Sequence, residues 1–166
     1  MINVDNIEIV KVGMGDLNIV TNPGMITTLG LGSCVAIVLY DNTTKIAGMA
    51  HVMLPNSKMI ANNSNRAKFM DTAIIDLISI MEGAGVKKRN LVAKIAGGAQ
   101  MFDFDSNDDI FSVGRKNIQA SRDVLHELNI PIIAEDTGKN YGRTVEFYTQ
   151  DGSFKIKSIG KEEKII

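Results

Sequence analysis

The chain has 166 residues, 45% of them apolar and 22% charged, and its formal net charge is −1. This length predicts a single domain over residues 1–166, and the composition excludes an intrinsically disordered chain. A net charge near zero gives no electrostatic reason to expect binding to nucleic acid or to an anionic membrane surface. One cysteine and two histidines allow no internal disulfide and no Cys-rich zinc site, so we expect neither a metal nor a cofactor.

The N-terminus lacks the basic start and apolar stretch of a secretory signal peptide. No apolar run approaches the roughly 18 residues that span a bilayer. A single cysteine is also typical of a protein from a reducing compartment. We therefore expect a cytoplasmic protein with no direct insertion into a membrane.

The first third of the chain contains β-branched and apolar runs separated by turn residues. Asn22-Pro23-Gly24 is a strong turn signal, and the polar residues 41–44 lie between two apolar runs, as in a β-hairpin. These runs predict strands over residues 7–12, 17–20, 25–29, 35–40 and 46–54.

Apolar residues then recur at helical spacing from Ala67 to Met81. The polar stretch 62–65 can cap this helix, and Gly83 and Gly85 can end it. Further along, the pattern predicts strands over 91–96 and 132–135, a second helix over 115–128, and a hairpin of 145–148 with 154–159. We expect residues 103–109 to form an exposed acidic loop and residues 161–166 to be loosely held.

Together these elements amount to roughly seven or eight strands and two main helices. Hairpins at both ends exclude an all-parallel sheet, and the strands do not alternate regularly with helices. The sequence therefore predicts an α+β protein with β-sheet layers and helices packed on one side.

Cys34 follows the glycine-rich segment Gly30-Leu31-Gly32-Ser33. A dinucleotide-binding loop is excluded, because Val35 stands where the third glycine is needed and a strand-like run follows instead of a helix. A glycine-rich turn can instead present Cys34 at the start of a strand, with the backbone N–H groups near Gly32 and Ser33 facing a developing oxyanion. The alternative is a buried cysteine with no chemical role.

The hairpin at 35–54 relates Cys34 to His51. A two-residue loop at 42–43 would place the two directly opposite each other, and a four-residue loop at 42–45 would make them diagonal neighbours on one face. Only a loop of odd length would put them on opposite faces. A histidine beside a cysteine can lower the thiol pKa and act as a base, so this pair predicts a nucleophilic site. We interpret the other histidine, His126, as a surface residue near a helix end.

The segment TLGLGSCV at 28–35, followed by HVMLP at 51–55, resembles the CheD family of chemoreceptor glutamine deamidases from bacterial and archaeal chemotaxis. Further similar stretches follow in the family's order, and the resemblance covers residues 8–158. The stretches are GMGD at 13–16, RAKF with DTA at 66–73, GGAQMF at 97–102, GRKN at 114–117, and AEDTG with GR at 134–143. Lys139 departs from the family, which commonly has a glycine there.

The resemblance implies a layered α/β sandwich with largely antiparallel or mixed sheets, related to the catalytic domain of cytotoxic necrotizing factor toxins. It places the family's catalytic residues on Cys34, His51 and Thr28. It implies that specific glutamines of methyl-accepting chemotaxis receptors are converted to glutamates, with ammonia released through a thioester on the cysteine. It also implies a partner, the CheC-type phosphatase, whose activity the deamidase stimulates.

Two other functions are compatible with parts of the sequence. The chain could be mainly a non-catalytic binding module that regulates a CheC-type phosphatase and receptors, because one face would serve both roles. A cysteine peptidase is less consistent, because only 17 positions separate Cys34 from His51, whereas the histidine of papain-like enzymes follows much later.

Overall fold

The structure is a computed structural model that describes residues 6–101 and 112–166. Within these ranges, ten strands form two five-stranded sheets, and two α-helices accompany them. The strands are β1 (Glu8–Lys11), β2 (Leu17–Val20), β3 (Gly24–Leu31), β4 (Val35–Asp41), β5 (Ile46–Val52), β6 (Leu91–Gly97), β7 (Ile132–Thr137), β8 (Arg143–Tyr148), β9 (Phe154–Lys157) and β10 (Lys164–Ile165). The helices are α1 (Met70–Gly83) and α2 (Val113–Glu127), and short 3-10 turns occupy Ser57–Met59, Arg66–Lys68 and Lys88–Asn90.

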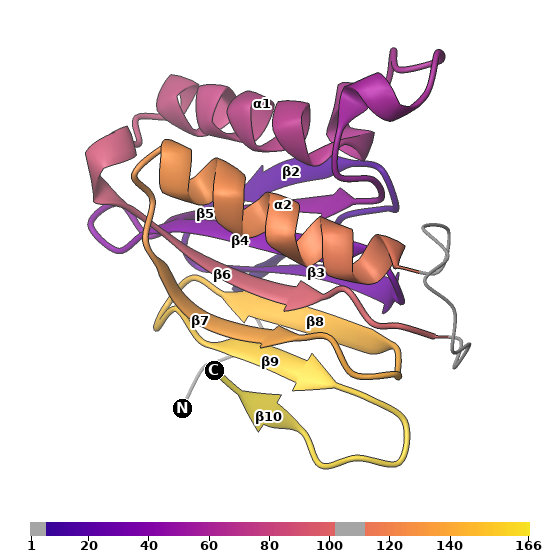
Figure 1. The fold of residues 1–166 in the computed structure, drawn as a ribbon. Coiled ribbons are helices and arrows are strands. Elements are labelled where there is room, and N and C mark those ends of the chain that lie inside the picture. Colours follow the sequence, from indigo (N-terminus) through magenta and orange to yellow (C-terminus); the bar gives the residue numbers. More distant parts are fainter. Residues whose placement is uncertain (1–5, 102–111) are drawn as a thin grey trace.

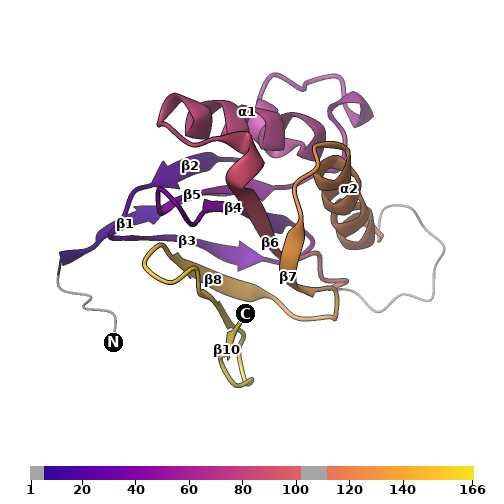
Figure 2. The ribbon, with the colours of Figure 1, turned by 90° about the vertical axis from the view of Figure 1, so that its left-hand side faces the viewer.

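The first sheet has the order β1-β3-β8-β9-β10, and the second has the order β2-β5-β4-β6-β7. The β1–β3 and β6–β7 pairs are parallel and all other pairs are antiparallel, so both sheets are mixed. The sheets pack against each other, and both helices cover the outer face of the second sheet (Figures 1 and 2). The predicted α+β class, with helices on one side of sheet layers, is confirmed.

The second sheet is buried on both faces, which explains why its central strands read as continuous apolar runs. Every residue of β4 and β5 is buried. Val35, Ile37 and Leu39 pack toward the helices, whereas Ala36 and Val38 belong to the core between the two sheets. Successive side chains of a strand point to opposite faces, so one strand supplies both cores.

Strand β3 of the first sheet contains a β-bulge near its end. Its register with β8 shifts between Thr28 and Leu31, and Gly30 has a φ of 69°. Thr28 and Leu31 are both buried, although three positions separate them, while Leu29 is exposed. A bulge adds a residue and changes which face the following side chains occupy. The bulge therefore directs the chain from the first sheet into the turn before β4.

Two expectations about element ends are wrong. The stretch 62–65 does not cap α1, which begins at Met70 after a 3-10 turn, with Phe69 at the N-cap and no side-chain cap. The fully buried Phe69 ring and a β-bridge from Phe69 to Leu54 fix that end by tertiary contacts instead. Asp71, in the first turn, accepts hydrogen bonds from the N–H and hydroxyl of Ser57.

The C-terminal residues are also not loose. Strand β10 pairs with β9, and the backbones of Phe154 and Ile166 exchange two hydrogen bonds. The Lys94 ammonium donates to the carbonyl of Ile166, which ties the chain end to the second sheet. The acidic segment expected as a loop at 103–109 lies outside the described residues. Within the described ranges, no helix combines the length and apolar character that a membrane span requires.

Candidate active site

Cys34 and His51 are diagonal neighbours on one face of the β4–β5 hairpin. The hairpin loop has four residues, 42–45, because Asp41 pairs with Ile46, and His51 lies opposite Ala36. Cys34 immediately precedes β4 and packs with Ala36 in the core between the sheets. Since side chains alternate along a strand, His51 points into the same core. The expectation that the two residues share a face is confirmed.

Thr28 reaches this site from the other sheet. Its Oγ1 lies 2.7 Å from His51 Nδ1 and donates a hydrogen bond of 2.7 Å to the carbonyl of Val12. A hydroxyl has one hydrogen, so Thr28 accepts rather than donates in its contact with the imidazole. The contact therefore requires the Nδ1–H tautomer of His51, which leaves a lone pair on Nε2.

The Nε2 atom of His51 is buried and has no hydrogen-bond partner among the described residues, Cys34 included. A buried polar atom without a partner is uncommon and often marks a catalytic role. Here it is the basic nitrogen of the ring, on the side away from Thr28. Its lone pair is therefore available to accept a proton.

Burial sets the charge state of the pair. It raises the pKa of the Cys34 thiol, partly offset by a hydrogen bond from its own backbone N–H, and it lowers the pKa of His51. Desolvation disfavours the charged form of each group. This corrects the expectation that the histidine would lower the thiol pKa. Both shifts favour the neutral forms, a thiol and an imidazole.

The turn before Cys34 is anchored through its carbonyl groups. The carbonyls of Gly32 and Cys34 accept hydrogen bonds of 2.8 Å from the N–H groups of Ala99 and Gly98. Glycine at position 97 lets the two backbone segments come this close, because a Cβ on residue 97 would lie 2.3 Å from the carbonyl oxygen of Cys34. The φ of Gly97, 111°, also favours glycine. With the carbonyls bound to the protein, the backbone N–H groups of the turn are the groups that could face an oxyanion.

Asn117 also belongs to the site, although the sequence did not predict a role for it there. Its side-chain amide donates hydrogen bonds of 2.9 Å to the carbonyl of Ser33 and 3.0 Å to that of Met53. It is fully buried on α2 and thus holds the residue before Cys34 and a residue just after His51. The sequence signal was a polar residue on the apolar face of a helix, where an asparagine must find internal partners.

Lys139, where the family commonly has a glycine, adopts a backbone conformation that favours glycine. Lys139 has a φ of 63°, in the left-handed region that favours glycine. Its carbonyl accepts a hydrogen bond of 2.9 Å from Gln100. His126 lies in the last turn of α2 and is exposed, as expected for a surface residue. Among the described residues, no three His, Cys, Asp or Glu side chains gather where they could hold a metal ion.

The chain is similar to known proteins over nearly its whole length. The family model described as CheD chemotactic sensory transduction matches residues 53–158. A protein of Lachnoclostridium phytofermentans named probable chemoreceptor glutamine deamidase CheD is 55% identical over 159 residues, which cover 96% of this chain and 99% of that protein. A protein of Halalkalibacterium halodurans named chemoreceptor glutamine deamidase CheD is 51% identical over 160 residues, covering 96% of this chain and 99% of that protein.

A solved structure also shares the fold. The crystal structure of Neisseria meningitidis protein NMB0706 superimposes with a TM-score of 0.52 at 9% sequence identity. The match covers 80% of this chain and 64% of that one. At so low an identity the likeness concerns the fold alone, and it agrees with the layered α+β architecture.

Proposed function

The chain belongs to the CheD family of chemoreceptor glutamine deamidases, and we propose that Cys34, His51 and Thr28 perform its reaction. The reaction is the hydrolysis of glutamine side-chain amides on chemoreceptors. The observation that carries the assignment is the 2.7 Å contact between Thr28 Oγ1 and His51 Nδ1, because it orients the basic nitrogen of a buried imidazole. In cysteine hydrolases a third residue orients the histidine in the same way.

The reaction begins with proton transfer from Cys34 to Nε2 of His51. The thiolate then attacks the carboxamide carbon of the glutamine, and the C=O electron pair moves onto oxygen. Backbone N–H groups of the turn at Gly32, Ser33 and Cys34 stabilise this oxyanion. Because burial favours the neutral forms of both groups, the proton transfer accompanies substrate binding rather than preceding it.

The tetrahedral intermediate collapses by breaking the C–N bond. Protonated His51 donates its proton to the leaving nitrogen, which departs as ammonia and leaves a thioester on Cys34. His51 then removes a proton from water, and the resulting hydroxide attacks the thioester carbon. Return of that proton to the sulfur releases glutamate and restores the thiol.

We also propose that the protein works in the cytoplasm and binds a CheC-type phosphatase, as the family resemblance implies. A lone buried cysteine is compatible with a reducing compartment. The phosphatase would bind to the same face of this protein as the receptor does. The alternative, a binding module without significant catalysis, differs in one measurable respect, which is turnover.

Receptor fragments incubated with the wild-type protein test this assignment. We expect ammonia release together with the mass change from glutamine to glutamate. The Cys34→Ala variant should release no ammonia, because the chain has no other cysteine, and it should still fold. Ammonia release by Cys34→Ala would refute the thiol mechanism. Receptor binding without turnover by the wild-type protein would favour the binding module.

A further inference from the structure

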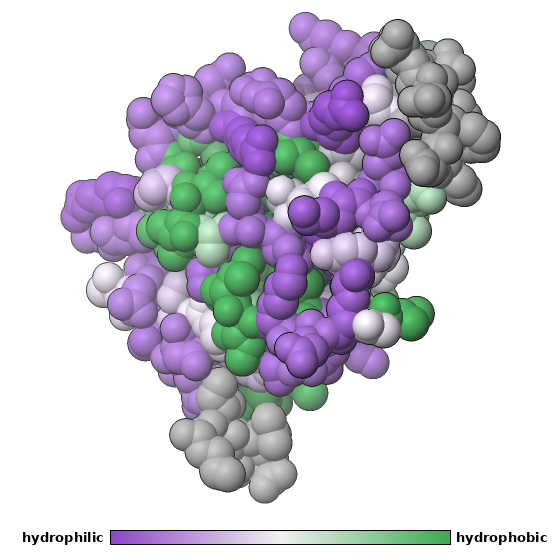
Figure 3. Space-filling model, turned by 60° about the horizontal axis from the view of Figure 1, so that its bottom comes forward, coloured by the Kyte–Doolittle hydropathy of each residue, from purple (hydrophilic) through white to green (hydrophobic). Residues whose placement is uncertain are grey.

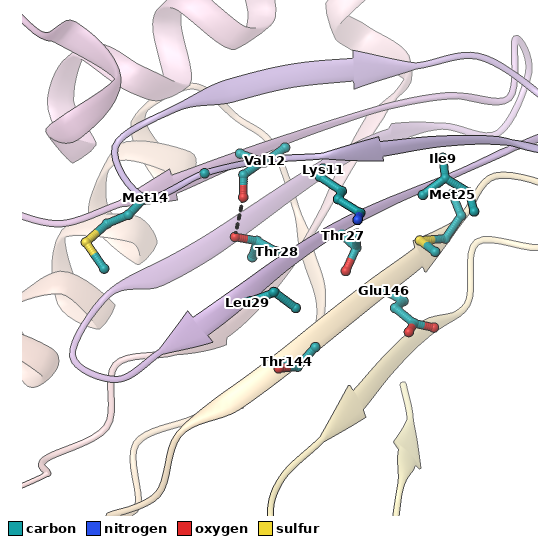
Figure 4. Close-up of a pocket in the computed structure, with 11 residues that line it drawn as sticks. Ile9, Lys11, Val12, Met14, Met25, Thr27, Thr28, Leu29, Thr144 and Glu146 are labelled. Carbon is teal, nitrogen blue, oxygen red and sulfur yellow. Dashed lines mark hydrogen bonds between the residues drawn. The ribbon is translucent and has the colours of Figure 1, made fainter.

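The outer face of the first sheet carries an apolar groove of about 600 Å³ (Figure 4). Alternate residues of three neighbouring strands form its floor, among them Ile9 of β1, Met25 and Leu29 of β3, and Thr144 of β8. These side chains point away from the core because Ile26, Thr28 and Val145 point into it. The loop residue Met14 closes one end.

Three large apolar side chains that line this groove are more than half exposed. Ile9 is 55% exposed, Met14 58% and Leu29 67%. Seen from the side of the first sheet, the surface shows apolar areas framed by polar ones (Figure 3). Clustered exposure of this kind, with a polar rim, is typical of an interaction surface.

The groove reaches one of the three catalytic residues, Thr28. Thr28 and Val12 both line it, and the hydrogen bond that joins them is the one that fixes the role of the Thr28 hydroxyl toward His51 (Figure 4). The loop at its end is also bound to the backbone of His51. Gly15 donates to the His51 carbonyl at 2.9 Å, and the His51 N–H donates to Asp16 at 3.0 Å. The groove is therefore linked to His51 through Thr28 and through the loop at Gly15 and Asp16, although His51 itself does not line it.

We propose that this groove binds the chemoreceptor segment that flanks the target glutamine, through apolar side chains of that segment. The inference rests on the proposed function. Cys34 is only 8% exposed and His51 is fully buried, so the reacting atoms offer little contact area to a protein substrate. Contacts remote from the reacting bond must then supply the affinity that brings a glutamine to the sulfur. The apolar surface that adjoins Thr28 is suited to that role.

Two single variants, Leu29→Glu and Ile9→Glu, test the proposal. Both side chains are exposed, so the new carboxylates stay in water in the free protein and become buried only when the receptor binds. We expect the KM for receptor fragments to rise by about 30-fold, as for a contact at the centre of an interface. The kcat and the rate of Cys34 alkylation by iodoacetamide should remain those of the wild-type protein.

Ile80→Glu is the matched control. Ile80 is 44% exposed on α1, which covers the second sheet on the opposite side of the molecule (Figure 1). This variant introduces the same charge and should leave the KM unchanged. A further variant, Leu29→Thr, keeps the β-propensity of the strand but loses the apolar contact. Thermal unfolding of all the variants shows whether a change in KM reflects weaker receptor binding or a less stable fold.

Several outcomes would overturn the proposal. An unchanged KM in both groove variants would do so, even if they lost binding to a phosphatase or to a second copy of the chain. A KM that rises equally in Ile80→Glu, or a parallel fall of kcat and alkylation rate, would also refute it. The affinity of receptor fragments for Cys34→Ala, with and without Leu29→Glu, tests docking without turnover. The proposed role of the groove can thus be refuted while the deamidase activity is confirmed, and the reverse.

Discussion

Thr28 Oγ1 lies 2.7 Å from His51 Nδ1, and the two residues come from different sheets. Thr28 belongs to β3, which pairs with β1 and β8, whereas His51 belongs to β5, which pairs with β2 and β4. The contact is buried between the sheets, where a hydrogen bond is electrostatically stronger than in water. Packing of the two sheets is therefore what orients the imidazole.

Removing the Thr28 hydroxyl should impair catalysis without abolishing it. Thr28→Val keeps the shape and leaves His51 Nδ1 and the Val12 carbonyl buried without a partner, which costs about 1–3 kcal/mol of unfolding free energy. By analogy with other orienting residues, the loss in kcat could reach about 10⁴-fold, and a neutral hydroxyl should matter less than a buried aspartate. Ammonia release from receptor fragments measures the effect. Thr28→Ser should restore most of the activity, and full activity of Thr28→Val would leave Thr28 as a strand residue only.

Alkylation of Cys34 should report the raised thiol pKa. Burial favours the neutral thiol, so the midpoint of the rate of reaction with iodoacetamide should lie above about 8.5, the value of a free cysteine. Unfolding in denaturant should bring the midpoint back to that value. A midpoint well below it in the native protein would mean that a thiolate–imidazolium pair exists before substrate binds.

The free energy of unfolding should fall on both sides of neutral pH. The pKa of His51 is lowered by burial, so below about 6.5 the unfolded chain binds a proton that the native protein does not, and stability falls as pH falls. The pKa of Cys34 is raised, so above about 8.5 the unfolded chain loses its proton first, and stability falls as pH rises.

Denaturant titrations at a series of pH values measure this dependence. Compared with the wild-type protein, His51→Gln should flatten the acidic side and Cys34→Ala the alkaline side. Half-buried carboxylates with lowered pKa values, such as Asp136, add a further loss of stability at lower pH that both variants keep. Identical slopes for His51→Gln and the wild-type protein between pH 7 and 5 would contradict the assigned neutral imidazole.

Asn117 should act as a positioning residue for both strand ends. Asn117→Leu removes the donors to the carbonyls of Ser33 and Met53, so we expect a loss in kcat of about 100-fold, with little change in KM. Ser121→Ala is the control, because Ser121 is equally buried on α2 and its hydroxyl donates a hydrogen bond to the carbonyl of Ile118 in the same helix. It should lower stability and leave kcat unchanged. An equal loss of kcat in both variants would assign Asn117 a purely structural role.

The sequence by itself determined the local geometry of the site. Side-chain alternation and a hairpin loop of even length are enough to place Cys34 and His51 on one face, and the loop proved to be 42–45. The apolar runs also predicted most strands, and helical spacing predicted both helices, with Gly85 in the left-handed region just after α1. These features depend on residues close together in the chain, where periodicity and turn chemistry decide the conformation.

Only the tertiary structure decided what lies around that pair. Contacts between separate segments of the chain decided the partner of Thr28 and the two carbonyls bound by Asn117. Such contacts also fixed the N-terminal end of α1, through the bridge of Phe69 to Leu54, and the pairing of β10 with β9. The charge state of Cys34 and His51 likewise follows from the burial that sheet packing imposes. A periodic pattern shows which face of an element is apolar, but not which other element covers it. The distances and the desolvation that govern the thiol and the imidazole therefore arise only when the two sheets and α2 pack together.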